Sequence, residues 1–229
     1  MTQPANHPKV IHEDNHIIVI DKPPLLATMG AQADEPSLVK WTKAWLKHKY
    51  HKPGNVYLGV VSRLDAFTCG LVVLAKTSKA AARLTRQFQN GEPQKTYTAI
   101  LETRPKKRSG RLIDWIRKDD SLRRMVICDA GEEGARKAEL TYQVLGFAGP
   151  LALVEVHLLT GRKHQIRVQF ASRNRPILGD RKYSAKNRFP EGIALHSSGL
   201  VLEHPVRREE MSFRIEPPRY WEMERFAGK

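Results

Sequence analysis

Residues 70–76, with the sequence Gly-Leu-Val-Val-Leu-Ala-Lys, most restrict the folds open to this chain. Their aliphatic side chains do not alternate with polar ones, which predicts a strand buried on both faces instead of an edge strand. Other short segments of strand-type composition lie on either side. They are Val10–Ile11, His16–Ile20, Val56–Val61, Lys95–Glu102, Arg111–Ile116, Met125–Cys128, Ala138–Phe147, Leu151–Leu158, Ile193–Leu202 and Met211–Ile215. The first two are predicted to form a hairpin that is followed by a loop.

Helical patterns are few. Ser37 fits the N-cap of one helix, and Ser78 is the predicted cap of a second, which stops at Asn90-Gly91. A third helix is predicted over about 163–172. The expected core-facing residues are Leu38, Trp41, Trp45 and Leu46 in the first helix, and Ala80, Leu84 and Phe88 in the second. Many strands, few helices and hairpin-length links predict an α+β fold on a largely antiparallel mixed β-sheet, flanked by helices and loops.

The organisation of the chain indicates one body. No Pro-, Ser- or Gly-rich linker, internal repeat or low-complexity tract interrupts the 229 residues. We therefore expect a single domain over 1–229, with its core at about 10–216. Strict alternation in the predicted strand Lys95–Glu102 places Lys95, Tyr97, Ala99 and Leu101 on one face.

The charge is strongly unbalanced. The chain has 39 Lys and Arg against 24 Asp and Glu, a formal charge of +15 and a pI near 10.0. Such an excess favours a polyanionic partner, with nucleic acid ahead of an acidic membrane surface. The basic residues form short clusters, which indicates the charged surface of a folded body. These clusters are Arg104–Arg108, Arg117-Lys118, Arg123-Arg124, Arg162-Lys163, Arg181-Lys182 and Arg207-Arg208, and the first is the best candidate for a mobile loop.

Several functional classes lack support. Cys69 and Cys128 form no CxxC pair and no zinc-type cluster, so we expect neither a disulfide framework nor a metal site, and a reduced, cytoplasmic compartment fits best. The N-terminus has no apolar signal core, and no apolar run approaches the length of a membrane span. P-loop, GxGxxG, HExxH and GxSxG motifs are absent from the sequence.

Two polar segments stand where the apolar pattern predicts tight packing. Arg63–Gly70 lies between two predicted strands, and for an arbitrary pair such as Arg63 and Asp65 a solvated salt bridge is the simpler interpretation. Thr160–Arg167 lies where a strand ends and a helix begins, a place that binds phosphate readily, although a basic helix face is more often just hydrated. Taken singly, neither segment assigns a function.

Taken together with other motifs in order along the chain, they resemble the RluA-type family of RNA pseudouridine synthases. The motifs are His12-Glu13-Asp14 with Ile18–Pro24, Arg63-Leu64-Asp65 with Thr68 and Gly70, Lys95-Thr96-Tyr97, Gly161–Arg167, Pro176–Asp180 with Tyr183, and Leu195-His196-Ser197 with His204-Pro205. Six motifs in the right order leave little room for coincidence. The resemblance implies a pseudouridine synthase catalytic domain, and hence an isomerase that acts on RNA.

By motif, the resemblance assigns Asp65 to the family's essential aspartate, Tyr97 to the tyrosine that packs on the target base, and Arg167 to the basic partner of the aspartate. It assigns Arg63 to the arginine that fills the gap left by a flipped base. The predicted RNA-binding set is Arg63, Arg162, Lys163, His164 and Gln165.

The chemistry accounts for these residue types. A stacked uridine must be extruded from the RNA, at a cost of a few kcal/mol, before its C1′ atom is accessible. Breaking the N1–C1′ bond builds positive charge on the sugar, and the carboxylate of Asp65 stabilises it. Tyr97 offers a flat apolar face and a hydroxyl that can relay the C5 proton. No group is oxidised or imported, so no cofactor is expected, and both attack of Asp65 on C1′ and proton removal from C2′ stay open.

Some positions depart from the common family pattern. Ser62 stands where His or Asn is frequent, Ala66-Phe67 replaces a more polar pair, and Cys69 replaces a serine. We expect these changes to alter how RNA is held. A small buried residue is the favoured interpretation of Cys69, against a cysteine-dependent enzyme.

The favoured hypothesis is a stand-alone, monomeric uridine isomerase that acts on ribosomal or transfer RNA. The alternative is a non-catalytic RNA-binding or ribosome-assembly protein on the same fold. Because the chain begins in the catalytic region, the S4-like domain of some relatives is expected to be absent. We expect RNA as partner, and no membrane.

Overall fold

The computed structural model describes residues 7–30 and 35–227. The described residues form two compact units, the first from residues 7–30, 35–93 and 199–215 and the second from 94–198 and 216–227. The architecture is α+β on a mixed, mostly antiparallel sheet, as predicted. The prediction of a single domain over the whole chain stays a prediction.

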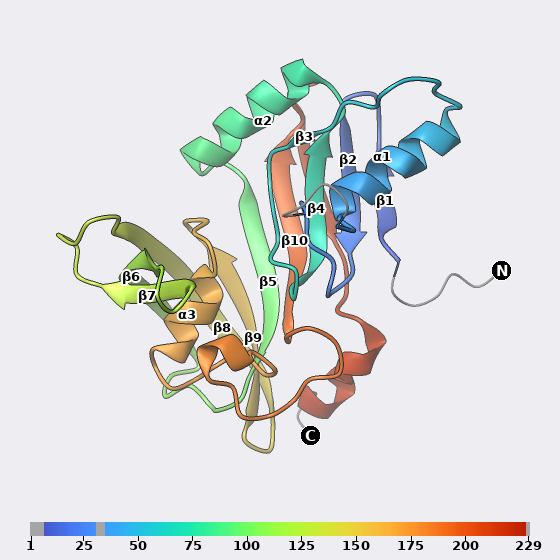
Figure 1. Ribbon diagram of the computed structural model, residues 1–229. Helices are drawn as coiled ribbons and strands as arrows, with labels where there is room; N and C mark the ends of the chain where they lie inside the picture. The colour runs from blue at the N-terminus through green and yellow to red at the C-terminus, as the bar shows by residue number, and fades with distance from the viewer. Residues whose placement is uncertain (1–6, 31–34, 228–229) are drawn as a thin grey trace. The chain divides into compact units, whose positions relative to one another are not determined.

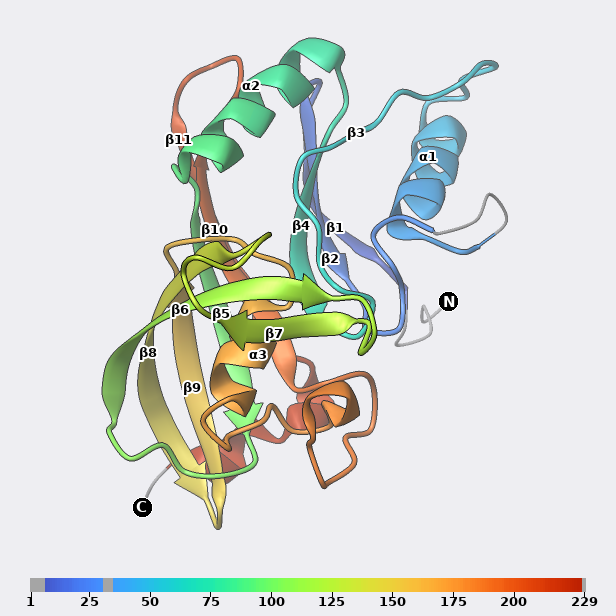
Figure 2. The same ribbon diagram turned by 60° about the vertical axis from the view of Figure 1, so that its left-hand side comes forward.

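The first unit is built on the strand order β1-β2-β4-β10, with β3 beside β4 (Figure 1) and β11 beside β10 (Figure 2). The β1–β2 hairpin predicted at the start of the chain is confirmed. The bounds are β1 (Lys9–Glu13), β2 (Ile17–Lys22), β3 (Gly59–Val60), β4 (Cys69–Ala75), β10 (Leu195–Glu203, of which residues 199–203 lie in this unit) and β11 (Glu210–Arg214).

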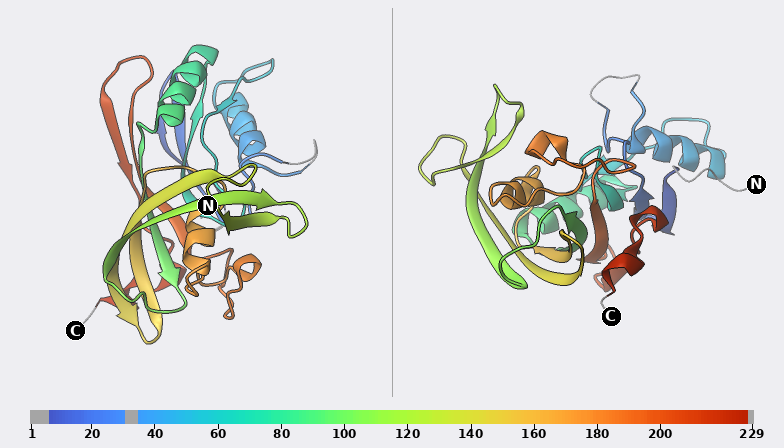
Figure 3. Two further views of the ribbon diagram at one scale, coloured as in Figure 1. Left: turned by 90° about the vertical axis from the view of Figure 1, so that its left-hand side faces the viewer. Right: turned by 90° about the horizontal axis from the view of Figure 1, so that it is seen from below.

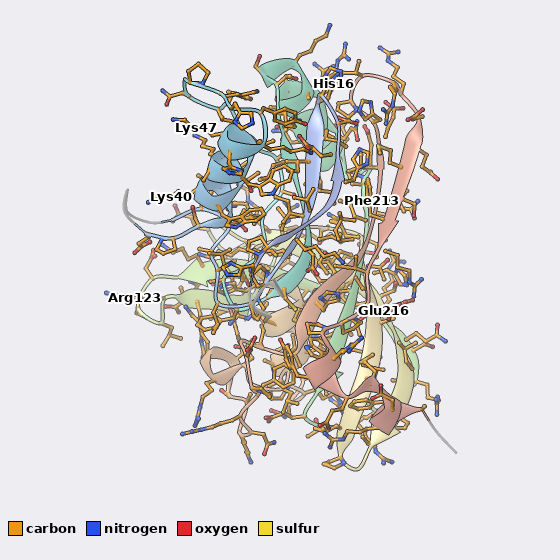
Figure 4. All side chains as sticks on the ribbon, turned by 90° about the vertical axis from the view of Figure 1, so that its right-hand side faces the viewer. His16, Lys40, Lys47, Arg123, Phe213 and Glu216 are labelled. Atoms are coloured by element: carbon orange, nitrogen blue, oxygen red, sulfur yellow. The ribbon has the colours of Figure 1, made fainter. Side chains whose placement is uncertain are left out.

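Two helices bury the two faces of this sheet. Alternate residues of β2 and β4 pack with α2 (Ser78–Asn90) on one face and with α1 (Leu38–Lys49) on the other. Every residue of β4 is therefore buried, which confirms the prediction for this apolar run. Figure 4 shows Lys40 and Lys47, which are exposed residues of α1.

The helix ends follow capping rules. Ser37 caps α1 as predicted, because its hydroxyl accepts a hydrogen bond from the Lys40 N–H. The prediction of Ser78 as the second cap is wrong by one residue: Thr77 has the extended backbone of a cap and accepts from the Ala80 N–H. Gly91 ends α2 in the left-handed conformation, as predicted.

The second unit has the strand order β10-β5-β9-β8-β6-β7 (Figure 2). From β5 onward in this order, each strand pairs antiparallel with the next. The helix α3 (Gln165–Ala171) packs its Val168 against Ile116, Ala138 and Tyr183. The strands are β5 (Gln94–Leu101), β6 (Ser109–Asp119), β7 (Arg124–Cys128), β8 (Arg136–Ala148), β9 (Leu151–Leu158) and the part of β10 before residue 199, and the 3-10 helices are η1 (Arg181–Tyr183), η2 (Arg219–Trp221) and η3 (Met223–Phe226).

The C-terminal helix η3 lies against β8, near the end of the chain in Figure 3. The pairing register of β8 with β9 shifts between Val144 and Gly146. A side chain at Gly146 would place its Cβ 2.0 Å from the Phe226 carbonyl oxygen. Only glycine permits this close approach of two backbones.

The strand predicted over Val56–Val61 is wrong in its extent, because only Gly59 and Val60 pair with β4. The hydroxyl of Ser62 then takes the place of a backbone partner: it donates to the Val73 carbonyl (3.1 Å) and accepts from the Val73 N–H (3.2 Å). The backbone ladder therefore ends at Val60, and the side chain of Ser62 makes the last bonds to β4 before the loop begins.

The basic segment 104–108 is a loop, as expected from its composition. Arg104 is nevertheless held in place, since its guanidinium donates to the Gly149 carbonyl (2.9 and 2.6 Å) and lies 4.5 Å from the Phe147 ring centroid. None of the helices in the described part of the chain has the length and apolar character needed to cross a membrane.

Candidate active site

The predicted catalytic aspartate lies in the Asp65 loop, defined as residues 62–68, which connects β3 to β4 in the first unit. Its turn is closed by a hydrogen bond from the Thr68 N–H to the Asp65 carbonyl, 3.1 Å. The buried Thr28 hydroxyl donates to the Leu64 carbonyl (2.9 Å) and accepts from the Leu64 N–H (3.1 Å). Side chains from the N-terminal segment thus fix the backbone on one side of Asp65.

Lys22 fixes the other side. This lysine ends β2, is 0% exposed, and donates from Nζ to the carbonyls of Pro23 (2.9 Å), Leu26 (2.8 Å) and Ala66 (3.3 Å). Desolvation lowers the pKa of Lys22 to about 8, against the opposing attraction of Cys69, Asp65 and Asp21. The ammonium therefore joins the residues after β2 to the Asp65 loop and adds positive charge beside it.

The family departures have distinct environments. Ser62 replaces a ladder partner of Val73, as described above. Cys69 is buried at the start of β4, which favours the packing role over that of a nucleophile. Phe67 is 49% exposed, so a large apolar side chain stands at the surface of the loop two residues from Asp65. An exposed aromatic and a nearby arginine, Arg63, form the combination that stacks on unpaired bases.

In the second unit, Tyr97 lies in β5, paired with Val156 of β9, and is 9% exposed. Lys95 precedes it by two residues and so lies on the same face of the strand, as predicted. The residues beyond Tyr97 in β5 are all buried. Tyr97 thus stands where the strand leaves the core.

The predicted RNA-binding segment begins with the basic turn, defined as residues 159–165, between β9 and α3. The turn wraps around one carbonyl: that of Glu139 accepts from the N–H groups of Leu159 (3.0 Å) and Thr160 (3.2 Å) and from Gln165 Nε2 (3.0 Å). Gln165 Oε1 in turn accepts from the Thr160 hydroxyl (2.8 Å) and the Arg162 N–H (3.0 Å).

These contacts divide the predicted set. Arg162 and Lys163 are exposed, whereas Gln165 is buried with its amide bonded inside the protein. Gln165 therefore shapes the turn, and RNA contact by any of these residues stays a prediction. His164 has a left-handed backbone (φ 52°), and its Nδ1 lies 2.8 Å from the Tyr183 hydroxyl.

Arg167 is buried in α3, and its guanidinium is held on two sides. Nε and one terminal nitrogen donate to the two carboxylate oxygens of Asp180, at 2.7 and 2.8 Å, and its Cζ lies 5.0 Å from the Tyr183 ring centroid. A bidentate pair of this kind fixes the plane of the guanidinium. The sequence motif contained Asp180 and Tyr183, but their pairing with Arg167 was not predicted.

The predicted site residues are divided between the units. Arg63 and Asp65 belong to the first, and the second contains Tyr97, Arg162, Lys163, His164, Gln165 and Arg167. Lys22, Thr28 and Asp180 position these residues and were missed as individual functional residues. Among residues 7–30 and 35–227, no group of three or more His, Cys, Asp or Glu side chains is arranged to hold a metal ion.

Comparisons with known proteins agree with the motifs. The family model described as RNA pseudouridylate synthase matches residues 16–172. The dual-specificity RNA pseudouridine synthase RluA of Haemophilus ducreyi is 32% identical over 90% of this chain and 92% of its own length, and the protein of the same name from Escherichia coli K12 is 30% identical over 90% and 91%.

A solved structure of human RNA pseudouridylate synthase domain containing 4 superimposes with a TM-score of 0.78, at 27% identity, over 95% of this chain and 92% of that one. Fold, sequence and motif order therefore converge. The chain belongs to the RNA pseudouridine synthase family, whose members isomerise uridine in RNA.

Proposed function

We propose that this protein converts specific uridines of ribosomal or transfer RNA to pseudouridine, with Asp65 as the carboxylate that acts at the ribose. The observation that supports it most is the anchoring of the Asp65 loop by Lys22 and Thr28, since a catalytic carboxylate must be held in one orientation. The formal charge of +15 suits a protein whose substrate is a polyanion.

The proposed reaction begins with extrusion of the target nucleotide. Arg63, whose planar guanidinium can stack, occupies the vacated space and offsets part of the unstacking cost. The uracil packs on Tyr97. Phe67, beside Asp65, is available for a neighbouring unstacked base, in line with the expectation that the unusual loop residues alter how RNA is held.

Asp65 then stabilises or captures the sugar as the N1–C1′ bond breaks. The uracil turns, a C5–C1′ bond forms, and the C5 proton leaves while N1 gains one, so atoms and charge balance without a cofactor. Arg167, fixed by Asp180, is the proposed basic partner of the carboxylate. Direct attack on C1′ and proton removal from C2′ both use Asp65, and the proposal includes either route.

The proposed substrates include both ribosomal and transfer RNA. The relatives named above carry the words "dual-specificity" in their names, which supports testing both ribosomal and transfer RNA with this protein. We further propose that it works as a monomer in the cytoplasm, where both RNA classes are found.

Tritium release from C5-labelled uridine in bulk RNA tests the proposal. Asp65→Asn keeps the size of the side chain but removes the charge, so we expect release to fall at least a thousandfold, to background. The exposed Asp129→Asn is the matched control and should release tritium like wild type. Undiminished release by Asp65→Asn would refute the role of Asp65, and wild type inactive on every RNA would favour a non-catalytic RNA-binding protein. Mapping pseudouridine with and without the gene then identifies the sites.

A further inference from the structure

Lys95 has an unusual setting near the start of β5. It is half-buried, and its Nζ lies so close to the basic turn that a Cβ on Gly161 would be 3.2 Å from it. Its partner across the ladder is Leu158, the last residue of β9, from which the basic turn departs. Because Gly161 has no side chain, the ammonium of Lys95 has room to lie beside the turn.

The charges around this ammonium do not balance. Burial lowers the pKa of Lys95, and the positive charge of Arg162 lowers it further. In the part of the chain that the structure describes, no carboxylate forms an ion pair with Lys95. Glu139, which holds the turn through its carbonyl, has its carboxylate engaged by Arg111 and Lys137.

Two neighbouring cations, one of them partly desolvated, cost free energy unless an anion joins them. The guanidinium of Arg162 is held at the turn by a hydrogen bond from its Nε to the Lys137 carbonyl (3.1 Å), and its backbone N–H donates to Gln165 Oε1 (3.0 Å). Within the described residues, the turn therefore keeps a guanidinium and an ammonium side by side with no carboxylate paired to the ammonium, an arrangement suited to an anionic ligand.

We propose that Lys95 and Arg162 bind one phosphodiester of the RNA substrate, close to the nucleotide whose base packs on Tyr97. This inference rests on the proposed function, because it uses the role of Tyr97. Lys95 and Tyr97 are two residues apart on one face of β5, which separates them by about 7 Å along the strand. One nucleotide spans that distance, so its phosphate and base can occupy the two side chains together.

The test uses RNA binding in an Asp65→Asn background, so that no turnover occurs. The probe is a mixture of unmodified ribosomal and transfer RNA transcripts, and its affinity is measured over a range of KCl concentrations. Lys95→Gln should reduce the magnitude of the slope of log K against log salt by about 0.7, the value for one phosphate of single-stranded RNA. Arg162→Gln should do the same. The double variant should lose little more slope than either single variant, because both cations serve one phosphate.

Lys79→Gln is the matched control: Lys79 is an exposed residue of α2, and its loss should leave the slope unchanged. Lys95→Arg should retain the slope, whereas a purely structural lysine would show reduced thermal stability and an unchanged slope in Lys95→Gln. An unchanged slope in that variant overturns the inference. If Lys95→Gln does not fold, the exposed Arg162→Gln decides by the same criterion.

Failure of this inference is separable from failure of the proposed function. Binding is measured without turnover, and tritium release is measured with Asp65 intact. If wild type is inactive but Lys95→Gln still reduces the slope of log K against log salt, only the enzymatic role is overturned. An active wild type whose slope is insensitive to Lys95 and Arg162 overturns only the phosphate site.

Discussion

The Asp65 loop and the basic turn are both folded by a side chain that bonds to backbone groups, but the two anchors differ in charge. Lys22 donates three hydrogen bonds from a buried ammonium, whereas Gln165 uses a neutral amide that both donates and accepts. A neutral anchor costs little to bury. A buried cation costs several kcal/mol, which is tolerated here beside the carboxylate of Asp65 and the other groups that attract it.

The difference has a functional meaning. The loop with the charged anchor is the one proposed to carry the reacting carboxylate, and its anchor also supplies positive potential. The basic turn presents Arg162 and Lys163, so a further cation as anchor would add to the repulsion already present there. A neutral amide orders this turn without increasing its charge.

Among the variants that compare the two anchors, Lys22→Met is expected to have the largest effect, and that effect is on turnover. The carbonyls of Pro23, Leu26 and Ala66 lose their donor, at about 1–3 kcal/mol for each group that stays unsatisfied. Removing an ammonium whose pKa is lowered to about 8 returns about 3 kcal/mol, which offsets only part of this loss when all three carbonyls stay unsatisfied. The loop itself loses its tether, and tritium release should fall at least a hundredfold.

The control for this variant is Lys43→Met, which removes an exposed lysine of α1 and should change neither activity nor stability. Turnover of Lys22→Met at the wild-type rate would break the comparison, because the charged anchor would then have no part in presenting Asp65.

Measuring the free energy of unfolding over a pH series sharpens the comparison, because Lys22 titrates and the amide of Gln165 does not. The folded-state pKa of Lys22 is lowered from 10.5 to about 8, so between these pH values the unfolded chain binds the proton and the folded protein does not. Stability from this group is therefore present above pH 10.5 and lost as the pH falls through 8. The free energy of unfolding of wild type, relative to Lys22→Met, should rise by about 2–3 kcal/mol from pH 8 to 10.5.

Urea denaturation of both proteins at several pH values in this window measures the difference. Other lysines and tyrosines titrate alike in the two proteins and cancel. If the free energies of unfolding of wild type and Lys22→Met change in parallel with pH, the desolvation of the ammonium that the structure indicates is contradicted.

Much of this arrangement could be predicted from local sequence. The apolar run that became β4, the hairpin at the N-terminus, the cap at Ser37 and the left-handed stop at Gly91 each depend on neighbouring residues or on burial of the whole segment. The errors were also local: Thr77 and Ser78 are both good caps, and the sequence does not distinguish which of them adopts the extended backbone.

The anchors could not be predicted in the same way, because their partners are distant in sequence. Lys22 meets Ala66 across 44 residues, Thr28 meets Leu64 across 36, and Gln165 meets Glu139 across 26. A lysine at a strand end is ordinarily solvated, so composition gave no reason to bury Lys22. Asp180 offered a better signal, since a carboxylate in a motif next to a basic segment suggests a partner, but only the fold selects Arg167.

The smallest expected effect is that of Gln165→Met, which breaks the neutral anchor. The Thr160 hydroxyl and the Arg162 N–H lose their acceptor, and the Glu139 carbonyl loses one of several donors. No buried charge is relieved in return, so urea denaturation at pH 7 should show a loss of about 1–2 kcal/mol in the free energy of unfolding. Exposed Gln143→Met on β8 is the matched control and should be neutral. Turnover should fall far less in Gln165→Met than in Lys22→Met, because the basic turn does not carry the proposed reacting carboxylate. An equal or larger loss of turnover in Gln165→Met would mean that the two anchors do not differ in function.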